Sequence, residues 1–263
     1  MAHFSLDIPD CVIVTGASSG LGRETTTALL ASGVEVIGVD HGVSVFDAEA
    51  GYRHLSADVA DESTWTAVVE SLPAELRSLG YVGSAAVLDV ETLAGDRTAE
   101  LWRRTWEVNV LGNILAVRAL LPVMRRLEHG AIVAVASVNA QFGEQQLGAY
   151  SSSKGALVSG IRAIALDYGR SGVHINVLAP GPMRAGLFER HLKSADDPAA
   201  FLAKREARQP IGRIPGADEV ASAGIFLLSK QASALHGTTL TADGGLTAGF
   251  DFRMGGEGAS VAI

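Results

Sequence analysis

The chain has 263 residues, of which 48% are hydrophobic and 19% are charged, and its formal net charge is −8. This composition excludes a disordered chain, and the excess of acids disfavours non-specific binding to nucleic acid, because phosphates require Lys and Arg. A single cysteine, Cys11, excludes an internal disulfide and a cysteine-based zinc site.

Three further patterns narrow the class of protein. The seven histidines are scattered without metal-ligand spacing, so no metal site is predicted. The first residues include acids and no basic region, unlike a secretory signal. The longest apolar stretch, 108–124, is broken by Asn109, Asn113 and Arg118, so no membrane span is predicted. We therefore expect a cytoplasmic protein without a nucleic-acid or membrane partner.

Short β-branched runs alternate with helical patterns along the chain. The predicted strands are 11–15, 34–39, 53–56, 81–87, 131–136, 173–178 and 238–241. The predicted helices lie near 20–32, 61–79, 97–128, 148–169 and 218–229. Several strands are continuously apolar, as strands buried on both faces are. The sequence therefore predicts the α/β class, with a doubly wound parallel sheet of about seven strands, helices on both faces and three α/β/α layers, as one domain over 1–263.

One segment interrupts this rhythm. Residues 183–212 form a polar, partly helical insertion between a strand and the next helix. Insertions of this length are usually lids, binding loops or disordered segments, so we expect a substrate loop. The tail after Gly245 contains Phe250 and Phe252, and both disorder and packing on a neighbouring subunit stay open.

A glycine-rich turn follows the first strand. The sequence from Thr15 to Gly22 reads TGASSGLG and leads directly into a helix. Glycines allow a close approach to a ligand, and a helix start presents free N–H groups that suit a pyrophosphate. The candidate cofactor contacts are Gly16, Ser18, Ser19, Gly20, Leu21 and Gly22. The spacing differs from the usual G-x-G-x-x-G motif, so a purely structural turn stays an alternative.

The second strand ends at Asp40, about 20 residues past Gly22. An acid at this place can accept hydrogen bonds from an adenosine ribose, and its charge repels a 2′-phosphate. His41 follows, and no arginine stands close to it in the sequence. We predict that NAD is preferred over NADP, with a solvated acid at a turn as the alternative.

Tyr150 and Lys154 stand one helical turn apart. Their i, i+4 spacing places them on one helix face, with Cβ atoms about 5–6 Å apart. A positive charge about 4 Å from a phenol is worth about 4 kcal/mol at an effective dielectric of about 20. Lowering a tyrosine pKa from about 10 to about 7 requires a similar energy. The pair is therefore a candidate acid and base, although this spacing also occurs by chance on many helices.

Two further polar residues fit the same site. Ser137 ends a strand, and α/β sheets bind ligands at the carboxyl ends of their strands. Its hydroxyl is placed to hydrogen-bond a substrate carbonyl oxygen. A turn serine is the alternative. Asn109 lies inside a helical pattern although asparagine is a mediocre helix former, so function and structure are equally open for it.

Together these residues resemble the short-chain dehydrogenase/reductase family in its short single-domain form, which has a Rossmann-like fold. The likeness runs from about residue 11 to 245. The matching segments are the TGxxxGxG turn at 15–22, the adenine-flanking pair Asp58-Val59, the tetrad Asn109, Ser137, Tyr150 and Lys154, the nicotinamide-flanking pair Pro180-Gly181, and the closing motif Asp243-Gly244-Gly245.

The resemblance implies an NAD(H)-dependent oxidoreductase that interconverts a secondary alcohol and a ketone by hydride transfer. Tyr150 would give or take the hydroxyl proton, and Lys154 would lower the tyrosine pKa and hold the nicotinamide ribose. Ser137 would orient the substrate oxygen. Asn109 would hold a water that links Lys154 to solvent. The cofactor contacts that the resemblance adds are Asp58, Val59, Ala85, Ala86, Tyr150, Lys154, Pro180, Gly181 and Met183.

The resemblance also implies a homo-oligomer, a tetramer or dimer formed through the long helices 97–128 and 148–169. Two segments depart from the family pattern. The NNAG segment reads Gly83-Ser84-Ala85-Ala86, and the PGxVxT segment lacks its threonine. These departures motivate an alternative, a catalytically weak or inactive NAD-binding regulator or scaffold. An enoyl reductase and a sugar epimerase are disfavoured by the tyrosine–lysine spacing and the lack of a long C-terminal domain.

The walls of the substrate pocket are predicted to come from the residues after Ser137 and from the start of the insertion. The candidate substrate-binding residues are Ser137, Asn139, Gln145, Tyr150, Pro182 and Leu187. This mix is apolar with a few amides and suits an alicyclic, steroid-like or sugar-like alcohol. For the charged residues of the insertion, Arg184, Arg190 and Lys193, a solvated helix face is expected, with contact to an anionic substrate as the alternative.

Overall fold

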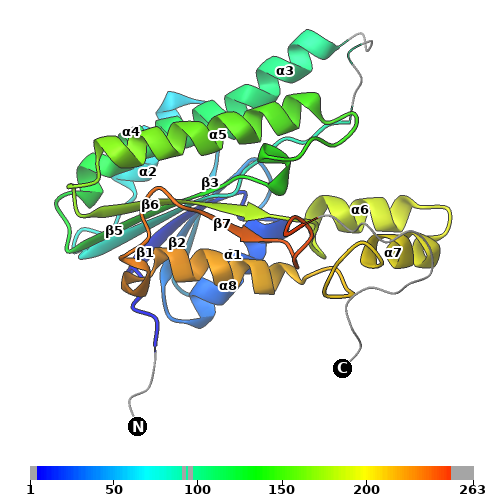
Figure 1. The fold of residues 1–263 in the computed structure, drawn as a ribbon. Coiled ribbons are helices and arrows are strands. Elements are labelled where there is room, and N and C mark those ends of the chain that lie inside the picture. Colours follow the sequence, from blue (N-terminus) through cyan, green and yellow to red (C-terminus); the bar gives the residue numbers. More distant parts are fainter. Residues whose placement is uncertain (1–4, 91–92, 94–96, 250–263) are drawn as a thin grey trace.

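The computed structural model describes residues 5–90, 93 and 97–249, except the side chains of Leu187 and His191. Its centre is a seven-stranded parallel sheet in the order β3-β2-β1-β4-β5-β6-β7 (Figure 1). The strands are β1 (Cys11–Thr15), β2 (Glu35–Asp40), β3 (Tyr52–Ser56), β4 (Ser78–Gly83), β5 (His129–Val135), β6 (Val173–Pro180) and β7 (Thr239–Ala242). The order reverses between β1 and β4, so a ligand crevice is expected at the carboxyl ends of these strands.

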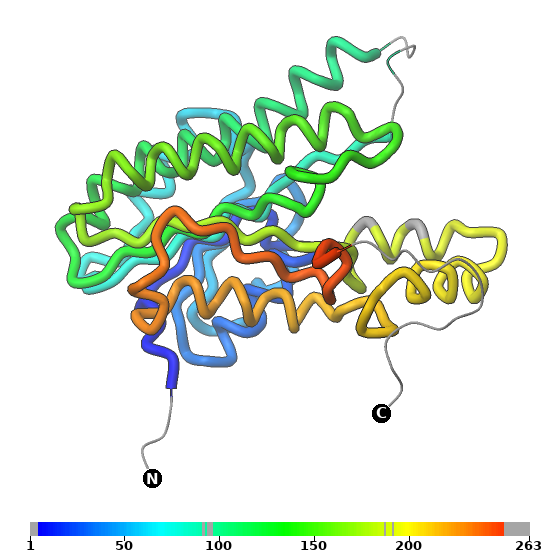
Figure 2. Tube along the Cα trace, viewed as in Figure 1, coloured from blue at the N-terminus to red at the C-terminus, as the bar shows by residue number. Residues whose placement is uncertain are grey.

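Helices cover both faces of the sheet. α2, α4 and α5 lie on one face with α3 beyond them, and α1 and α8 lie side by side on the other (Figure 1, Figure 2). The helices are α1 (Gly20–Ala31), α2 (Glu62–Glu70), α3 (Thr98–Trp106), α4 (Gly112–Met124), α5 (Gly148–Asp167), α6 (Gly186–Ser194), α7 (Pro198–Glu206) and α8 (Ala217–Leu228). Short 3₁₀ turns are η2 (Val138–Ala140) and η3 (Lys230–Ala232). The predicted doubly wound α/β/α architecture is confirmed.

Each face of the sheet has its own hydrophobic core. Alternate residues of β1 feed the two cores: Ile13 packs with the α2, α4 and α5 side, and Val12 with the α1 and α8 side. Trp65 and Leu157 belong to the first core, and Leu228 to the second. Burial on both faces explains why the central strands read as continuous apolar runs.

Strand β4 lies earlier in the chain than predicted. The expected range 81–87 is wrong, because the chain leaves the sheet at Gly83, where a Cβ would overlap the Asn113 side chain. The apolar run 84–90 that follows is irregular, and most of it lines the cavity described below. Its hydrophobicity therefore reflects a pocket wall rather than a strand.

Helix α2 is shorter than the predicted 61–79. It ends at Glu70, and the Ser71 hydroxyl donates to the carbonyl of Val68 at 2.8 Å. Pro73 follows and has no N–H to continue the helix. Ser78 already belongs to β4, so the apolar residues there pack in the sheet.

The predicted helix 97–128 contains an interruption. A π-helical segment, η1 (Glu107–Leu111), separates α3 from α4, and the helix ends at Met124. By length and composition alone, Thr98–Met124 would suit a membrane span, which the sequence analysis did not expect. However, 56% of its apolar window is buried inside the fold, as in the core helix of a globular protein.

The insertion 183–212 lies between β6 and α8 and contains two short helices, α6 and α7. Both helices project beyond the carboxyl end of the sheet (Figure 1). Phe188 of α6 and Phe201 of α7 join them, with ring centres 5.9 Å apart. The tail residues Phe250 and Phe252 lie outside the described residues.

Candidate functional site

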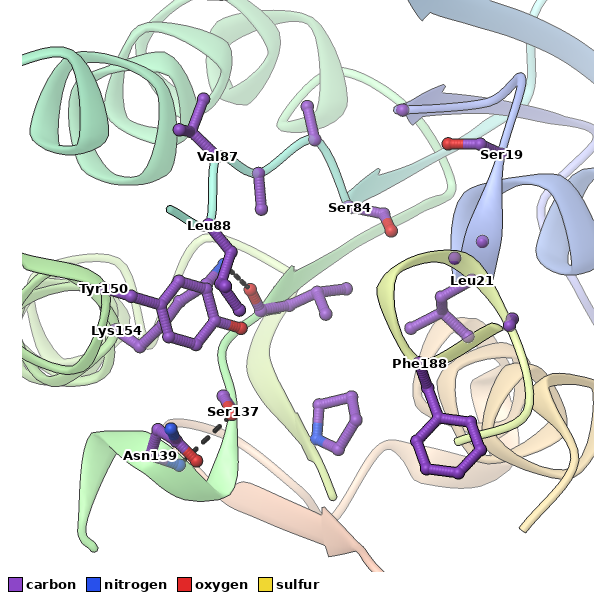
Figure 3. Close-up of a pocket in the computed structure, with 18 of the residues that line it drawn as sticks. Ser19, Leu21, Ser84, Val87, Leu88, Ser137, Asn139, Tyr150, Lys154 and Phe188 are labelled. Atoms are coloured by element: carbon purple, nitrogen blue, oxygen red, sulfur yellow. Dashed lines mark hydrogen bonds between the residues drawn. The ribbon is translucent and has the colours of Figure 1, made fainter. Parts of the chain in front are cut away.

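A cavity of about 630 Å³ lies at the carboxyl ends of the strands, beside the point where the strand order reverses (Figure 3). The predicted cofactor residues that line it are Gly16, Ser19, Gly20, Leu21, Asp40, Asp58, Val59, Ala85, Ala86, Tyr150, Lys154, Pro180, Gly181 and Met183. The predicted substrate residues that line it are Ser137, Asn139, Gln145, Tyr150 and Pro182. Ser18, Gly22 and Asn109 do not line it, and the Leu187 side chain lies outside the described residues.

The glycine-rich turn is shaped by close backbone contacts. Gly16 and Gly20 have φ values of 68° and 54°, which favour glycine. A Cβ on Gly22 would overlap the Gly16 carbonyl group, so this residue shapes the turn although it does not face the cavity. Ser19, at the N-cap of α1, makes no side-chain capping bond. The first N–H groups of α1 therefore remain available to an anion.

Ser18 and Asp40 connect the turn to the end of β2. The Ser18 N–H donates to Oδ2 of Asp40, and the Gly42 N–H donates to Oδ1, both at 2.9 Å. The Ser18 hydroxyl is buried and has no hydrogen-bond partner among the described residues. An uncapped helix start, an unpartnered hydroxyl and a fixed carboxylate fit the phosphates and ribose of a nicotinamide dinucleotide.

A further residue at this end of the cavity, not predicted from the sequence, is Arg104 of α3. Its Nη1 lies 2.9 Å from Oδ2 of Asp58, and its Nη2 lies 3.3 Å from Nε2 of His41. Burial opposes ionisation of Asp58, but hydrogen bonds from Ala60 N–H and Arg104 outweigh it and lower the pKa of Asp58. The fold thus brings an arginine close to His41, whereas the residues around Asp40 in the sequence include none. No local pattern in the sequence pairs Arg104 with Asp58.

The altered NNAG segment keeps its backbone contact with the glycine-rich turn. The Ala85 N–H donates to the Thr15 hydroxyl at 3.0 Å. A Cβ on Gly16 would lie 3.0 Å from the Ala85 nitrogen, so the two segments pass very close to each other. The missing asparagine side chain therefore leaves this wall of the cavity in place.

Tyr150 and Lys154 lie side by side on α5, and the phenol oxygen points into the cavity (Figure 3). The Lys154 side chain is buried, its Nζ donates to the carbonyl of Val135 at 2.8 Å, and Nζ lies 5.6 Å from the centre of the Tyr150 ring. The predicted juxtaposition of phenol and ammonium on one helix face is confirmed.

Burial, rather than the neighbouring ammonium, dominates the pKa of Tyr150 in the fold. Burial raises the pKa of Tyr150, the Ser137 hydroxyl acts to lower it, and the negative charge of Glu144 raises it further. Burial also lowers the pKa of Lys154 to about 7. Because burial disfavours the charged form of Lys154, the lysine is a weaker source of positive charge beside the phenol.

Ser137 lies two residues past the end of β5 and faces the cavity beside Asn139. Its Oγ accepts a hydrogen bond from the Asn139 N–H at 3.1 Å (Figure 3). The Asn139 side chain donates to Oε2 of Glu144 at 3.1 Å. Glu144 lines the cavity but was not predicted, because an acid in an exposed loop carries no distinctive pattern.

Asn109 braces the cavity wall from behind. Its Oδ1 accepts from the Val87 N–H at 2.8 Å, and its Nδ2 donates to the Val87 carbonyl and to the Ser153 hydroxyl, both at 3.0 Å. Its own carbonyl accepts from Nδ2 of Asn113 at 3.1 Å. The side chain is fully buried and its polar atoms are used on Val87 and Ser153, which gives Asn109 a positioning role in the wall, and its hold on a water beside Lys154 stays a prediction.

The insertion contributes several lining residues that were not predicted. These include Phe188, Arg190, Phe201 and Arg205. For Arg190 a solvated helix face was expected, and the residue is exposed but also borders the cavity. Among the described residues no group of three or more potential metal ligands occurs.

Comparison with known proteins agrees with this geometry. The family model described as "Enoyl-(Acyl carrier protein) reductase" matches residues 16–247. A curated relative, 2-(S)-hydroxypropyl-CoM dehydrogenase 3 of Xanthobacter autotrophicus, is 33% identical over 248 residues, which cover 91% of this chain and 97% of the relative. The chain belongs to the short-chain dehydrogenase/reductase family.

Two further members show the range of this family. Cis-4-hydroxycyclohexanecarboxylate dehydrogenase of Sinomonas cyclohexanicum is 34% identical over 248 residues, which cover 90% of this chain and 96% of the relative. The solved aldohexose dehydrogenase of Thermoplasma acidophilum superposes with a TM-score of 0.86 at 28% identity, covering 96% of this chain and all of that one. This short-chain dehydrogenase/reductase is therefore an alcohol/ketone oxidoreductase that uses a nicotinamide cofactor.

Proposed function

We propose that the chain is an NAD(H)-dependent dehydrogenase that interconverts a secondary alcohol and a ketone, with Tyr150 as the acid and base. The observation that carries this proposal is the placement of Tyr150, Ser137 and the uncapped start of α1 around one cavity. Asp40 supports the choice of NAD, because its fixed carboxylate can accept from ribose hydroxyls and repels a 2′-phosphate.

The residues divide between binding and proton transfer. A bound nicotinamide supplies the carbon that exchanges the hydride and, when oxidised, a positive charge near the phenol. In its protonated form Lys154 uses one of its three N–H donors on Val135, which leaves two for a ribose hydroxyl. Ser137 donates to the substrate oxygen and holds it near the phenol. Tyr150 then takes the hydroxyl proton during oxidation, or returns it during reduction.

The walls favour a compact, mostly apolar alcohol. Leu88, Val138, Pro182, Met183 and Phe188 line the cavity near these groups. Two relatives are named for secondary alcohols, one of them on a cyclohexane ring. We propose an alicyclic alcohol as the substrate core and the cytoplasm as the place of action.

A panel of secondary alcohols with NAD or NADP tests the proposal. We expect reduced-cofactor absorbance to rise with cyclic alcohols and NAD, and Asp40→Ala to reduce the NAD over NADP ratio of kcat/KM by about tenfold or more, as loss of charge-assisted hydrogen bonds does. A wild-type enzyme that prefers NADP would overturn the cofactor proposal. An enoyl thioester with NADH is the comparison reaction. Turnover of that compound alone, or NADH binding without any turnover, would contradict the proposed activity.

A further inference from the structure

Two arginines of the insertion border the same cavity as Tyr150. Arg190 lies on α6 and Arg205 on α7, and both belong to the lining. Phe188, on the same helix as Arg190, lies across the cavity from Tyr150 (Figure 3). Both arginines lie on the two helices that the Phe188–Phe201 contact joins, so the insertion supplies this part of the cavity lining.

Neither guanidinium group is neutralised by the part of the chain that the structure describes. The third lining arginine, Arg104, is paired with Asp58 at 2.9 Å, and the neighbouring Arg213 is paired with Glu219. By contrast, Arg190 and Arg205 have no carboxylate within 4.0 Å among the described residues. The chain has a net charge of −8, so an overall excess of basic residues does not explain why two unpaired arginines lie in one cavity lining.

Arg205 is also held in place. Its guanidinium lies over the Phe201 ring, 5.2 Å from the ring centre, and Phe201 packs on Phe188. A cation over an aromatic face is attracted by the ring quadrupole. A side chain fixed in this way loses less entropy when it binds an anion.

Building on the proposed function, we propose that Arg190 and Arg205 bind an anionic substituent, a carboxylate or sulfonate, on the alcohol or ketone substrate. Guanidinium groups suit such oxyanions because they can donate two parallel hydrogen bonds to two oxygens of one group. The phosphates of the cofactor are the competing anion. They are already provided with the free N–H groups at the start of α1. The substrate class is then a hydroxy acid in which the anionic group is remote from the reacting carbon.

A binding measurement without turnover tests this inference separately from the reaction. The probes are 4-oxocyclohexanecarboxylate and its carboxamide, which differ mainly in charge, added to the protein saturated with NAD. In this mixture neither probe can be reduced. We expect the carboxylate to bind at least about tenfold more tightly than the amide, because a charge-assisted hydrogen bond is worth about that much. Equal binding of the two, or no detectable binding of the carboxylate, would overturn the inference.

Variants assign the effect to the two arginines. Arg190→Gln/Arg205→Gln is expected to remove the preference for the carboxylate while leaving NADH affinity unchanged. Arg208→Gln is the matched control, because Arg208 is exposed on the same insertion and does not line the cavity. A double variant that keeps the preference for the carboxylate, or one that instead weakens NADH binding, would contradict a substrate role. Carboxylate preference without alcohol turnover would support this site and overturn only the proposed reaction.

Discussion

Glu144 places a negative charge beside the phenol that we propose as acid and base. This charge raises the pKa of Tyr150, whereas alcohol oxidation requires the phenol to accept a proton. We expect Glu144→Gln to move the rising limb of the kcat/KM profile for oxidation to lower pH. The amide oxygen can still accept from Asn139, so the local geometry is preserved.

The measurement is the pH dependence of kcat/KM for oxidation in the wild type, in Glu144→Gln and in the control variant Glu75→Gln. Glu75 is an exposed acid that does not line the cavity. An unchanged profile in Glu144→Gln, or an equal shift in Glu75→Gln, would show that the Glu144 charge does not act on the phenol.

Lys154 predicts a specific dependence of stability on pH. Burial lowers its pKa to about 7 in the folded chain, whereas the unfolded chain holds the proton up to about pH 10. Between these values the unfolded chain binds more protons, so the free energy of unfolding rises with pH. Relative to Lys154→Met, we expect the cofactor-free wild type to gain a few kcal/mol between about pH 7 and about pH 9.5 in urea denaturation. A difference that stays constant with pH would rule out a depressed lysine pKa.

Residue spacing predicted some contacts and missed others for physical reasons. Tyr150 and Lys154 could be paired from sequence because the helix itself fixes an i, i+4 neighbour. The contact of Arg104 with Asp58 depends on how α3 packs beside α5, which no local pattern encodes. For the tyrosine pKa, the sequence supplied the Coulomb attraction of Lys154, whereas the desolvation of both groups depends on how the fold buries them.

At the scale of elements, Asn109 joins the π-helical segment η1 to the cavity wall. Replacing it with alanine leaves the Val87 N–H and C=O without their side-chain partners. We expect Asn109→Ala to lower the free energy of unfolding by about 1–3 kcal/mol and to speed amide exchange at Val87. Asn139→Ala, at a partly exposed amide, should change stability by less than about 0.5 kcal/mol. Equal effects of the two substitutions would remove the bracing role.

The elements themselves were predicted well where the apolar pattern and the length of the segment indicate the same kind of element, as in β1, β5 and α5. The β4 boundary failed because the apolar run 84–90 serves a pocket wall, and hydrophobicity alone does not distinguish a ligand surface from a strand. The π-helical segment was not predicted, and the tertiary hydrogen bonds that Asn109 makes from it to Val87 and Ser153 follow from no local pattern.

At the scale of the whole molecule, the strand order places the glycine-rich turn, Asp40 and Tyr150 at one edge of the sheet. The alternation of strands and helices was sufficient to predict this architecture, since right-handed crossovers leave few topologies. The projection of α6 and α7 beyond the sheet could not be predicted from the sequence. The place of Arg190 and Arg205 in the cavity lining depends on it.

The outer surface of α3 to α5 supports the proposed homo-oligomer. Trp106, Leu111 and Leu166 are exposed apolar side chains on these helices, and Leu166 is 84% exposed. We expect light scattering to give a dimer or tetramer and Leu166→Glu to shift it toward the monomer, because a buried unpaired charge opposes association. A monomeric wild type would contradict this expectation.

The most direct test of the account is Tyr150→Phe, which removes only the phenol oxygen. With NAD and the best alcohol of the panel, we predict that kcat falls by about 10²–10⁴, the range for loss of a general acid or base, while the dissociation constant for NADH stays within about threefold. A variant that binds NADH normally and retains more than about a tenth of the wild-type kcat would show that Tyr150 does not carry the proton.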